Sequence, residues 1–286
     1  MRFCRFDGGR LGLVEKDSVR DVTAALDVLP SFRYPLPNYD VFIANIDAVR
    51  KEAARIASSA PVIPLAGLKL LSPVANPGKI IAAPVNYQKH LDEVQTDPAL
   101  HNNNTAHTIT IHKAGLFLKA HSSLVGPSEG VAITLPDRRT DHEVELAFVI
   151  GKTCKNVKKE DAMQYIAGYS IGLDITIRGS EDRSFRKSPD GYTVLGPWLV
   201  TADEIADPHN LNLHIAVNGE QRQSSNTKYL ILDCAALIEM ASSFYTLYPG
   251  DIISTGTPEG VSPILPGDHV VATVEGIGTL EMDVRA

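Results

Sequence analysis

Three carboxylates stand on two short segments in which apolar and polar residues alternate. In DHEVELAFVI, residues 141–150, the alternation of a β-strand places Glu143 and Glu145 on one face, with Cα atoms roughly 7 Å apart. The same alternation in YSIGLDITIR, residues 169–178, places Asp174 on the small and polar face of a second strand. Converging carboxylates repel one another unless a positive charge lies among them. Ligands that are all oxygens suit a hard cation, so we expect Mg²⁺, Mn²⁺ or Ca²⁺ rather than zinc.

A second interpretation of these acids needs no metal. They could pair with basic side chains on a solvated face, where Arg138, Arg139, Lys152 and Arg178 are the available partners. Two glutamates separated by one residue are common in exposed strands. The spacing alone therefore leaves both interpretations open.

The segment NYQKHLDE, residues 86–93, carries a candidate general base. His90 and Glu93 are three residues apart, which on a helical turn puts them on one side and lets the carboxylate orient the imidazole. The alternative is a surface histidine beside an acid on a polar turn. The spacing predicts that the two side chains meet, whichever role they have.

Two further segments contain polar residues with a chemical use. RSFRKSPDGYTVLGPW, residues 183–198, reads as an ordered loop in which Lys187 could stabilise an oxyanion. STGTPEGV, residues 254–261, reads as a glycine turn in which Thr257 could donate to a ligand oxygen. An exposed loop lysine and a plain turn are the alternatives. No GxSxG elbow or local cysteine-histidine pair supports a covalent serine or cysteine mechanism.

Two groups of elements must position these residues. RFCRF and RLGLVE around an Asp-Gly turn predict a hairpin, VRDVTAAL predicts a strand running into a turn, and residues 39–58 predict an amphipathic helix. The proline-rich residues 61–77 predict a connector along the surface. We place a domain boundary near Ser72, with a small N-terminal α+β domain over residues 1–72 and a catalytic domain over residues 73–286.

The larger domain is expected to be mixed α/β and dominated by β-strands. Short β-rich runs recur from residue 79 onward, and turn residues separate most of them. Helices are predicted at KKEDAMQYIAG and at LDCAALIEMASSFYTL. The polar residues 96–113 form the longest irregular stretch, long enough for a lid or a mobile loop.

Composition excludes several partners. The 286 residues include 27 basic and 34 acidic side chains, a net charge of −7, and no basic block, so nucleic acid is not an expected partner. Cys4, Cys154 and Cys234 are far apart and suggest neither a disulfide scaffold nor a zinc site. Charge begins at the N-terminus, and no apolar run approaches the ~18 residues that span a bilayer. We expect a cytoplasmic protein without a membrane partner.

Six motifs occur in an order that resembles the fumarylacetoacetate hydrolase family. They are NYxxHxxE, FLKAHSSLVGP, DHEVELAFVIG, the strand GLDIT, the lysine loop ending in LGPW, and STGTPEGV. The resemblance runs from about Lys79 to the C-terminus. It implies a C-terminal domain of β-sheets rolled around a central cavity, a homodimer, and a divalent metal at the cavity mouth. Mg²⁺ is the expected ion, with Mn²⁺ or Ca²⁺ as alternatives.

The resemblance also implies roles for individual residues. By this resemblance, the metal ligands are Glu143, Glu145 and Asp174, and the dyad on a lid is His90 with Glu93. The active-site lysine is Lys187, and the two residues that contact the substrate are Arg178 and Thr257. The chain departs from the family pattern near the substrate. These departures lie at Pro84, Leu173, Gly179 and Pro189, and they leave the specificity open.

The resulting functional hypothesis is a metal-dependent hydrolase. It cleaves a carbon-carbon bond in a β-diketo acid such as an acylpyruvate and releases pyruvate, or a related oxo acid, with a carboxylic acid. His90 would take a proton from the attacking water, and Lys187 would help to hold the enolate charge. The first alternative is decarboxylation or keto-enol isomerisation of an oxo diacid. The second is a non-catalytic protein that binds an oxo acid.

Overall fold

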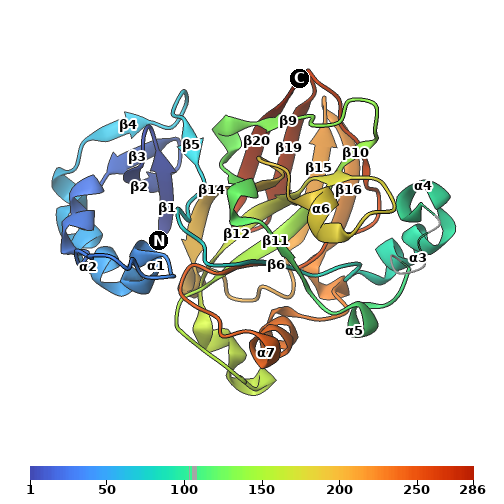
Figure 1. Ribbon diagram of the computed structural model, residues 1–286. Coiled ribbons are helices and arrows are strands. Elements are labelled where there is room, and N and C mark those ends of the chain that lie inside the picture. The colour runs from blue at the N-terminus through green and yellow to red at the C-terminus, as the bar shows by residue number, and fades with distance from the viewer. Residues whose placement is uncertain (103, 105–107) are drawn as a thin grey trace.

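The computed structural model describes residues 1–102, 104 and 108–286, and β-strands dominate the described part of the chain (Figure 1). The expected mixed α/β fold is confirmed. The largest sheet contains β1 (Arg2–Phe6), β2 (Arg10–Glu15), β3 (Ser18–Asp21), β4 (Val62–Pro64), β5 (Leu70–Leu71), β6 (Ile80–Ala82), β7 (Phe117–Lys119), β8 (Leu124–Val125), β11 (Val144–Ile150), β12 (Ile166–Asp174), β14 (Thr193–Thr201) and β17 (Ile252–Ser254). Its order is β4-β3-β2-β1-β14-β12-β11-β17-β6-β7, with β5 beside β1 and β8 beside β14.

Two smaller sheets complete the β structure of the described residues. The five-stranded sheet contains, in spatial order, β16 (Glu220–Asn226), β15 (Asn212–Val217), β19 (His269–Val274), β20 (Gly278–Arg285) and β9 (Val131–Ala132). The three-stranded sheet contains β13 (Thr176–Ile177), β10 (Thr140–His142) and β18 (Ser262–Pro263). Because β10 and β13 directly adjoin β11 and β12 in the chain, the small sheet borders the strands that carry the acids.

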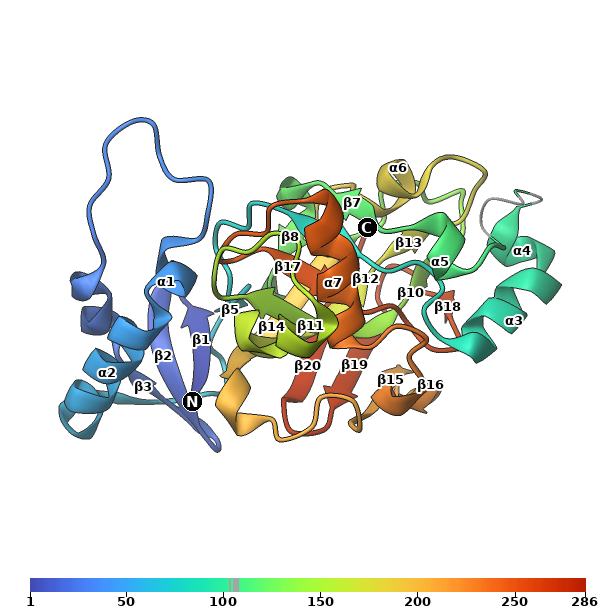
Figure 2. The same ribbon diagram turned by 90° about the horizontal axis from the view of Figure 1, so that it is seen from below.

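The helices are short and lie around the sheets. They are α1 (Val41–Ala44), α2 (Ile46–Ile56), α3 (Gln88–Thr96), α4 (Pro98–His101), α5 (Ile111–Ala114), α6 (Arg183–Lys187) and α7 (Cys234–Phe244). Two views place α3 and α4 at the end of the molecule opposite the N-terminal strands (Figures 1 and 2). None of the helices in the described residues has the length and apolar character needed to cross a membrane.

The N-terminal strands and α2 enclose a small core of their own. The predicted hairpin of β1 and β2 is confirmed, with Phe3 opposite Leu13. Phe3, Leu13 and Val49 of α2 belong to one apolar cluster. The single predicted helix is divided at Asn45, whose side-chain amide donates to Val41 O at 2.9 Å while its φ of −117° leaves the helical range.

The N-terminal sheet is continuous with the rest of the molecule. Strand β1 pairs antiparallel with β14, so that Arg2 lies opposite Val200. The other face of the hairpin, with Cys4 and Phe6, packs into the large core beneath it. The proposed division after residue 72 stays a prediction. The hydrogen-bonded pairing of β1 with β14 makes one sheet run through both parts.

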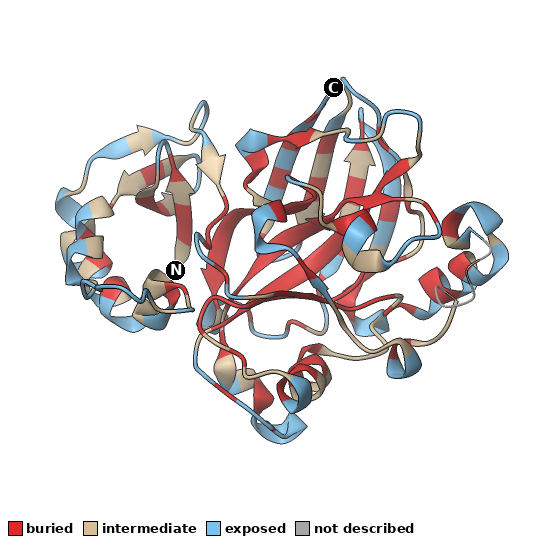
Figure 3. Ribbon diagram, in the orientation of Figure 1, coloured by how far each residue is buried: buried red, intermediate tan, exposed pale blue. Residues whose placement is uncertain are grey.

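Strand β11 lies in the middle of the largest sheet and is buried along its whole length (Figure 3). It pairs with β12 on one side and with β17 on the other. The predicted alternation is present: Leu146 and Phe148 enter one core cluster, whereas Ala147 and Val149 enter another. A strand with protein on both faces holds its side chains in fixed directions, which suits a site built on it.

Two predicted elements differ from the structure. Residues 96–113 contain α4 and α5, so this stretch is less irregular than expected, and residues 103 and 105–107 within it lie outside the described residues. Residues 159–165 form a 3₁₀ helix rather than an α-helix. The helix predicted around residue 240 is confirmed as α7, which begins at Cys234 after the side chain of Asp233 accepts a hydrogen bond from Ala236 N.

Candidate metal centre and active site

The antiparallel pairing of β11 with β12 brings the three predicted carboxylates together. Val144 lies opposite Leu173, and Asp174 N donates to Glu143 O at 3.0 Å. One carboxylate oxygen from each of Glu143, Glu145 and Asp174 lies within 4.8 Å of the others, and all three residues are buried. The shared face predicted from alternation, and the convergence that the six motifs suggested, are therefore present in the structure.

Two basic side chains hold this cluster from one side. Lys187 Nζ donates to Glu143 Oε2 at 2.8 Å, to Asp174 Oδ2 at 2.7 Å and to Thr176 Oγ1 at 2.6 Å. Arg178 Nη2 donates to Glu143 Oε1 at 2.9 Å. Burial alone would raise the pKa of Glu143, but Lys187 and Arg178 hold that pKa well below its usual range. The acids do pair with a nearby arginine, as the metal-free interpretation held, but the face is buried rather than solvated.

Lys187 comes from a helix that the sequence did not predict. Residues 183–187 form α6, whose N-terminus is capped by Asp182 through a bond from Ser184 N. An ammonium group has three hydrogens, and the three acceptors above use all of them. In this structure Lys187 therefore fixes the carboxylates and adds positive charge, while its predicted role as an oxyanion donor stays a prediction.

Lys119 is a site residue that the sequence reasoning missed. Its side chain is 1% exposed and donates to Asp174 Oδ1 and, at 2.8 Å, to Tyr192 O. Burial lowers the pKa of this lysine, and Asp174 opposes that shift. Two lysines thus bind the two oxygens of one carboxylate. The available signal was a lysine in the otherwise apolar run LFLKA, where an unpaired charge would be costly.

Glu145 shows that the donor set fits a divalent cation. Its Oε2 accepts a hydrogen bond from Gly256 N at 2.8 Å, but within the described residues no lysine or arginine forms an ion pair with it. Burial, with the neighbouring charges of Asp174 and Glu143, raises the pKa of Glu145 well above its ordinary value. Among the described residues, Glu145 is therefore the member of the cluster whose charge no lysine or arginine pairs with. A hard cation bound by these oxygens would supply the missing charge.

The predicted contact between His90 and Glu93 is present in the structure. On α3 the ring nitrogen His90 Nδ1 lies 2.8 Å from Glu93 Oε2, and His90 is 4% exposed. Because an ionised carboxylate only accepts, the ring proton lies on Nδ1 and leaves Nε2 as the basic nitrogen. Gly260 N donates to Glu93 Oε1 at 3.0 Å. Helix α3 is thereby docked on the turn that follows β17.

A small cavity connects the dyad to the lysine. It has a volume of about 40 Å³, and His90, Phe117 and Lys187 are among the residues that line it. This volume is far below the roughly 300 Å³ at which ligand pockets usually begin. We therefore expect the wall formed by α3 and α4 to move when a substrate enters.

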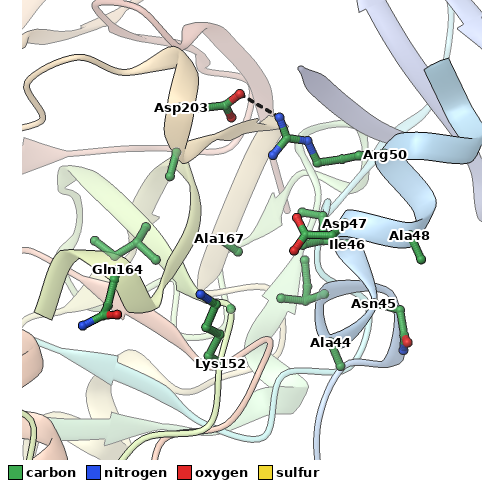
Figure 4. A pocket seen from close by; sticks show the side chains of 14 residues that line it. Ala44, Asn45, Ile46, Asp47, Ala48, Arg50, Lys152, Gln164, Ala167 and Asp203 are labelled. Carbon is green, nitrogen blue, oxygen red and sulfur yellow. Dashed lines mark hydrogen bonds and ion pairs between the residues drawn. The ribbon is translucent and has the colours of Figure 1, made fainter. Parts of the chain in front are cut away.

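A larger cavity lies elsewhere. It has a volume of about 550 Å³ and lies between α1 and α2 and the loops after β11 and β14 (Figure 4). Lys152, considered above as a partner for the acids, lines this second cavity instead. Arg50 and Asp203 form an ion pair across it at 2.7 Å. No member of the carboxylate cluster and neither residue of the dyad lines it.

Thr257 lies on the turn that follows β17, and its hydroxyl is engaged within the protein. Oγ1 donates to Val144 O at 2.9 Å and accepts from Gln223 Nε2 at 2.8 Å. Gln223, which the sequence did not single out, also accepts from Val144 N at 3.1 Å. The substrate contact assigned to Thr257 stays a prediction. What the structure contains is a buried clamp that fixes the turn against β11.

The side chain of Arg178 is likewise engaged within the protein. Its Nε donates to Asp141 Oδ2 at 2.7 Å, and with the contact to Glu143 this ties two acids to one guanidinium. Burial alone would lower the pKa of Arg178, but Glu143 and Asp141 raise it. Arg178 nonetheless lines the small cavity, so its predicted contact with substrate remains open to test.

Comparison with known proteins places these features in a family. Residues 79–285 match the family described as fumarylacetoacetate (FAA) hydrolase, C-terminal. The chain belongs to the fumarylacetoacetate hydrolase family. The family resemblance noted from the six motifs is thereby confirmed.

Relatives within the fumarylacetoacetate hydrolase family include enzymes that match over the full length. A maleylpyruvate hydrolase from Aquipseudomonas alcaligenes is 58% identical over 286 residues, which cover 100% of both chains. The crystal structure of a maleylpyruvate hydrolase from Sphingobium sp. SYK-6 in complex with manganese(II) and pyruvate is 40% identical, with a TM-score of 0.84, and covers 100% of this chain and 99% of that one. A mitochondrial oxaloacetate tautomerase from Rattus norvegicus is 37% identical over 241 residues, which cover 79% of this chain and 72% of that protein.

Proposed function

We propose that this protein is a divalent-metal-dependent hydrolase that cleaves the carbon-carbon bond of an acylpyruvate, with maleylpyruvate as its substrate. Cleavage of maleylpyruvate by water yields pyruvate and maleate. The observation that carries the proposal is one small cavity lined by the oriented His90 and by Lys187, whose amino group is bonded to two members of the buried carboxylate cluster. Full-length identity of 58% to a maleylpyruvate hydrolase supports it.

Glu143, Glu145 and Asp174 would hold the metal. A bound divalent cation would polarise the oxo-acid oxygens of the substrate and fix its orientation. We propose Mg²⁺ in the cell, with Mn²⁺ as an effective substitute and Ca²⁺ as a further possibility. Manganese in the related hydrolase structure supports a metal of this class.

His90 would act as the general base. With its proton on Nδ1 bonded to Glu93, His90 Nε2 is free to take a proton from a water molecule as that water attacks the carbonyl carbon distal to the pyruvoyl group. The bond between that carbon and the methylene breaks, the acyl part leaves as a carboxylic acid, and the methylene carbon gains a proton to give pyruvate. The positive charge of Lys187 would favour the enolate that precedes this protonation.

Two further parts of the proposal concern the assembly and its location. We propose a homodimer, as the family resemblance implies, for which light scattering should give twice the mass of one chain. A cytoplasmic location is consistent with three buried cysteines that form no disulfide.

The experiment is a panel of substrates and variants. Maleylpyruvate, a simpler acylpyruvate and oxaloacetate are each incubated with enzyme and Mg²⁺, Mn²⁺ or EDTA. We expect metal-dependent release of pyruvate from the acylpyruvates, lost in His90→Ala while metal binding by calorimetry is unchanged. His269→Ala, which removes a histidine that is 49% exposed, is the matched control. Hydrolysis by His90→Ala at the wild-type rate would rule out His90 as the base.

Keto-enol tautomerisation is the second candidate, and the relative named as an oxaloacetate tautomerase favours it. It would use the same cation site and the same base without an attacking water. Enol loss from oxaloacetate, followed by ultraviolet absorbance without pyruvate release, would distinguish it from hydrolysis or decarboxylation. A protein that binds oxo acids without any turnover would be the remaining outcome.

A further inference from the structure

One turn contacts both halves of the candidate active site. Residues 255–260 follow β17 and begin beside the carboxylate cluster, where Gly256 N donates to Glu145 Oε2 at 2.8 Å. They end beside α3, where Gly260 N donates to Glu93 Oε1 at 3.0 Å. The proposed metal ligand and the residue that orients the proposed base are therefore bonded to amides of the same short segment. A change in the shape of this turn would move the two amides relative to each other.

The middle of the turn is held by the side chain of Gln223, which lies on β16 and is 1% exposed. Its Nε2 donates to Thr257 Oγ1 at 2.8 Å and to Pro258 O at 2.7 Å. Its Oε1 accepts from Val144 N at 3.1 Å and from His142 Nδ1 at 3.2 Å. A primary amide has two donor hydrogens and two acceptor lone pairs, so these four contacts use its full capacity.

Strand β16 joins the turn to the strand that carries the glutamates. Val144 stands between the two glutamates of the cluster, so Gln223 Oε1 is anchored on β11 while Nε2 holds the turn. The backbone of β16 also packs against the end of the turn. Gly260 has a φ of +94°, and a Cβ at this position would lie 2.4 Å from Arg222 O. The turn therefore rests on β16 through both a side chain and a close backbone contact.

We infer that Gln223 is a positioning residue, which holds residues 255–260 in one shape and thereby fixes the metal ligand Glu145 and the base-orienting Glu93 relative to each other. The inference rests on the proposed function for the roles of Glu145 and Glu93. Gln223 is neutral and acts through the turn, so its contribution is geometric. Residues that orient metal ligands change metal affinity or activity by about 10- to 100-fold when they are replaced, and a displacement of about 1 Å costs about 10²-fold in rate.

Two variants of Gln223 in the full-length enzyme test this inference. Gln223→Met nearly keeps the volume and removes all four hydrogen bonds, whereas Gln223→Asn keeps the neutral amide and shortens its reach by about 1.5 Å. For Gln223→Met we expect the Kd for Mn²⁺, measured by calorimetry, to rise about 10-fold. At saturating Mn²⁺, kcat for maleylpyruvate should fall about 10- to 100-fold, with KM changed by less than about 3-fold. Gln223→Asn should change both quantities in the same direction by smaller factors.

Two control variants separate positioning from a general loss of stability. Gln221→Met replaces an exposed glutamine on the same strand, and Leu237→Ala destabilises the core at α7. Both should keep the wild-type Kd for Mn²⁺ and the wild-type kcat. If the Gln223 variants only lower Tm, and keep both quantities as Leu237→Ala does, the role of Gln223 is merely structural and the inference is overturned.

A double-variant cycle tests the path to the base. Glu93→Ala already removes the orientation of His90 and the bond to Gly260, so adding Gln223→Met should lower kcat by less than about 3-fold more. Two losses that multiply in full would show that Gln223 does not act through Glu93, and would overturn that part of the inference. If wild type hydrolyses no acylpyruvate, yet both Gln223 variants weaken Mn²⁺ binding, the proposed function is wrong and the positioning of the metal ligand by Gln223 stands. Wild-type Mn²⁺ affinity in both variants overturns the inference whatever the turnover.

Discussion

Replacement of Glu93 by glutamine should disable the general base His90, because it moves the ring proton of His90 from one nitrogen to the other. In the wild type, Glu93 Oε2 accepts from His90 Nδ1 at 2.8 Å and Oε1 accepts from Gly260 N at 3.0 Å. Glutamine keeps one oxygen, and the backbone N–H of Gly260 can only donate, so that oxygen must face Gly260. The amide NH₂ then faces His90 Nδ1, which must become an acceptor. The ring proton moves to Nε2, where the base is needed.

The magnitude follows from what a positioned base contributes. General-base catalysis is worth about 10²- to 10⁴-fold, and an equivalent tautomer error in serine proteases costs about 10⁴-fold. We therefore expect Glu93→Gln to lower kcat by about 10²- to 10⁴-fold with a small change in KM. Metal affinity should stay at the wild-type value, because Glu143, Glu145 and Asp174 are untouched.

Steady-state release of pyruvate and titration calorimetry with Mn²⁺ measure the two quantities. Glu93→Asp is the useful comparison, because it keeps the charge and shortens the reach. A Glu93→Gln enzyme with kcat within about 5-fold of wild type would refute the tautomer argument, since that loss is far smaller than a misplaced base produces. A parallel loss of Mn²⁺ binding would instead indicate that the variant disturbs the carboxylate cluster.

Three other predictions concern the metal and the stability of the fold. Metal at about 100 times its Kd should stabilise the protein by about 2.7 kcal/mol, a rise in Tm of about 5 °C that EDTA reverses; an unchanged Tm would contradict the proposed centre. Leu237→Ala on α7 removes a side chain with 0% exposure and should lower the free energy of unfolding by about 3 kcal/mol in urea, whereas a loss below about 1 kcal/mol would mean that the core refills. Asp233→Ala removes the cap of α7 and should cost about 1 kcal/mol at neutral pH. Burial alone would raise the pKa of Asp233, but Lys159 and the Ala236 amide hold that pKa below the ordinary value of 3.8. The difference in free energy of unfolding between wild type and Asp233→Ala should therefore persist above pH 3.8 and vanish as the pH falls through the pKa of the folded state.

Local periodicity predicted well which side chains of the candidate site point in the same direction. Alternation placed Glu143, Glu145 and Asp174 on the correct faces, because side-chain direction in a strand depends only on position along it. Helical spacing placed His90 beside Glu93 for the same reason. Such patterns show which way a side chain points, and the family motifs then suggested that the faces converge.

The remaining features depend on contacts between distant segments. Lys119 binds Asp174 across 55 positions of sequence, and Gln223 clamps a turn 34 positions away, so no local pattern could indicate either contact. Helix α6 has five residues flanked by a capping aspartate and a Ser-Pro pair, too short for a periodic signal. The occupancy of the donor groups on Lys187 is likewise a property of packing and appears only in three dimensions.

The bond from Gly260 N to Glu93 has a consequence for the order of events in a catalytic cycle. The same carboxylate that orients the base also anchors α3, so outward movement of the helix would break the bond to Gly260 and carry His90 and Glu93 away from the cavity together. The general base would be in position only while α3 is docked on the turn, which protects a bound substrate from premature attack. The Gly260 amide also provides a natural reporter: its hydrogen-exchange rate should measure how often the wall opens, and a bound product should slow it.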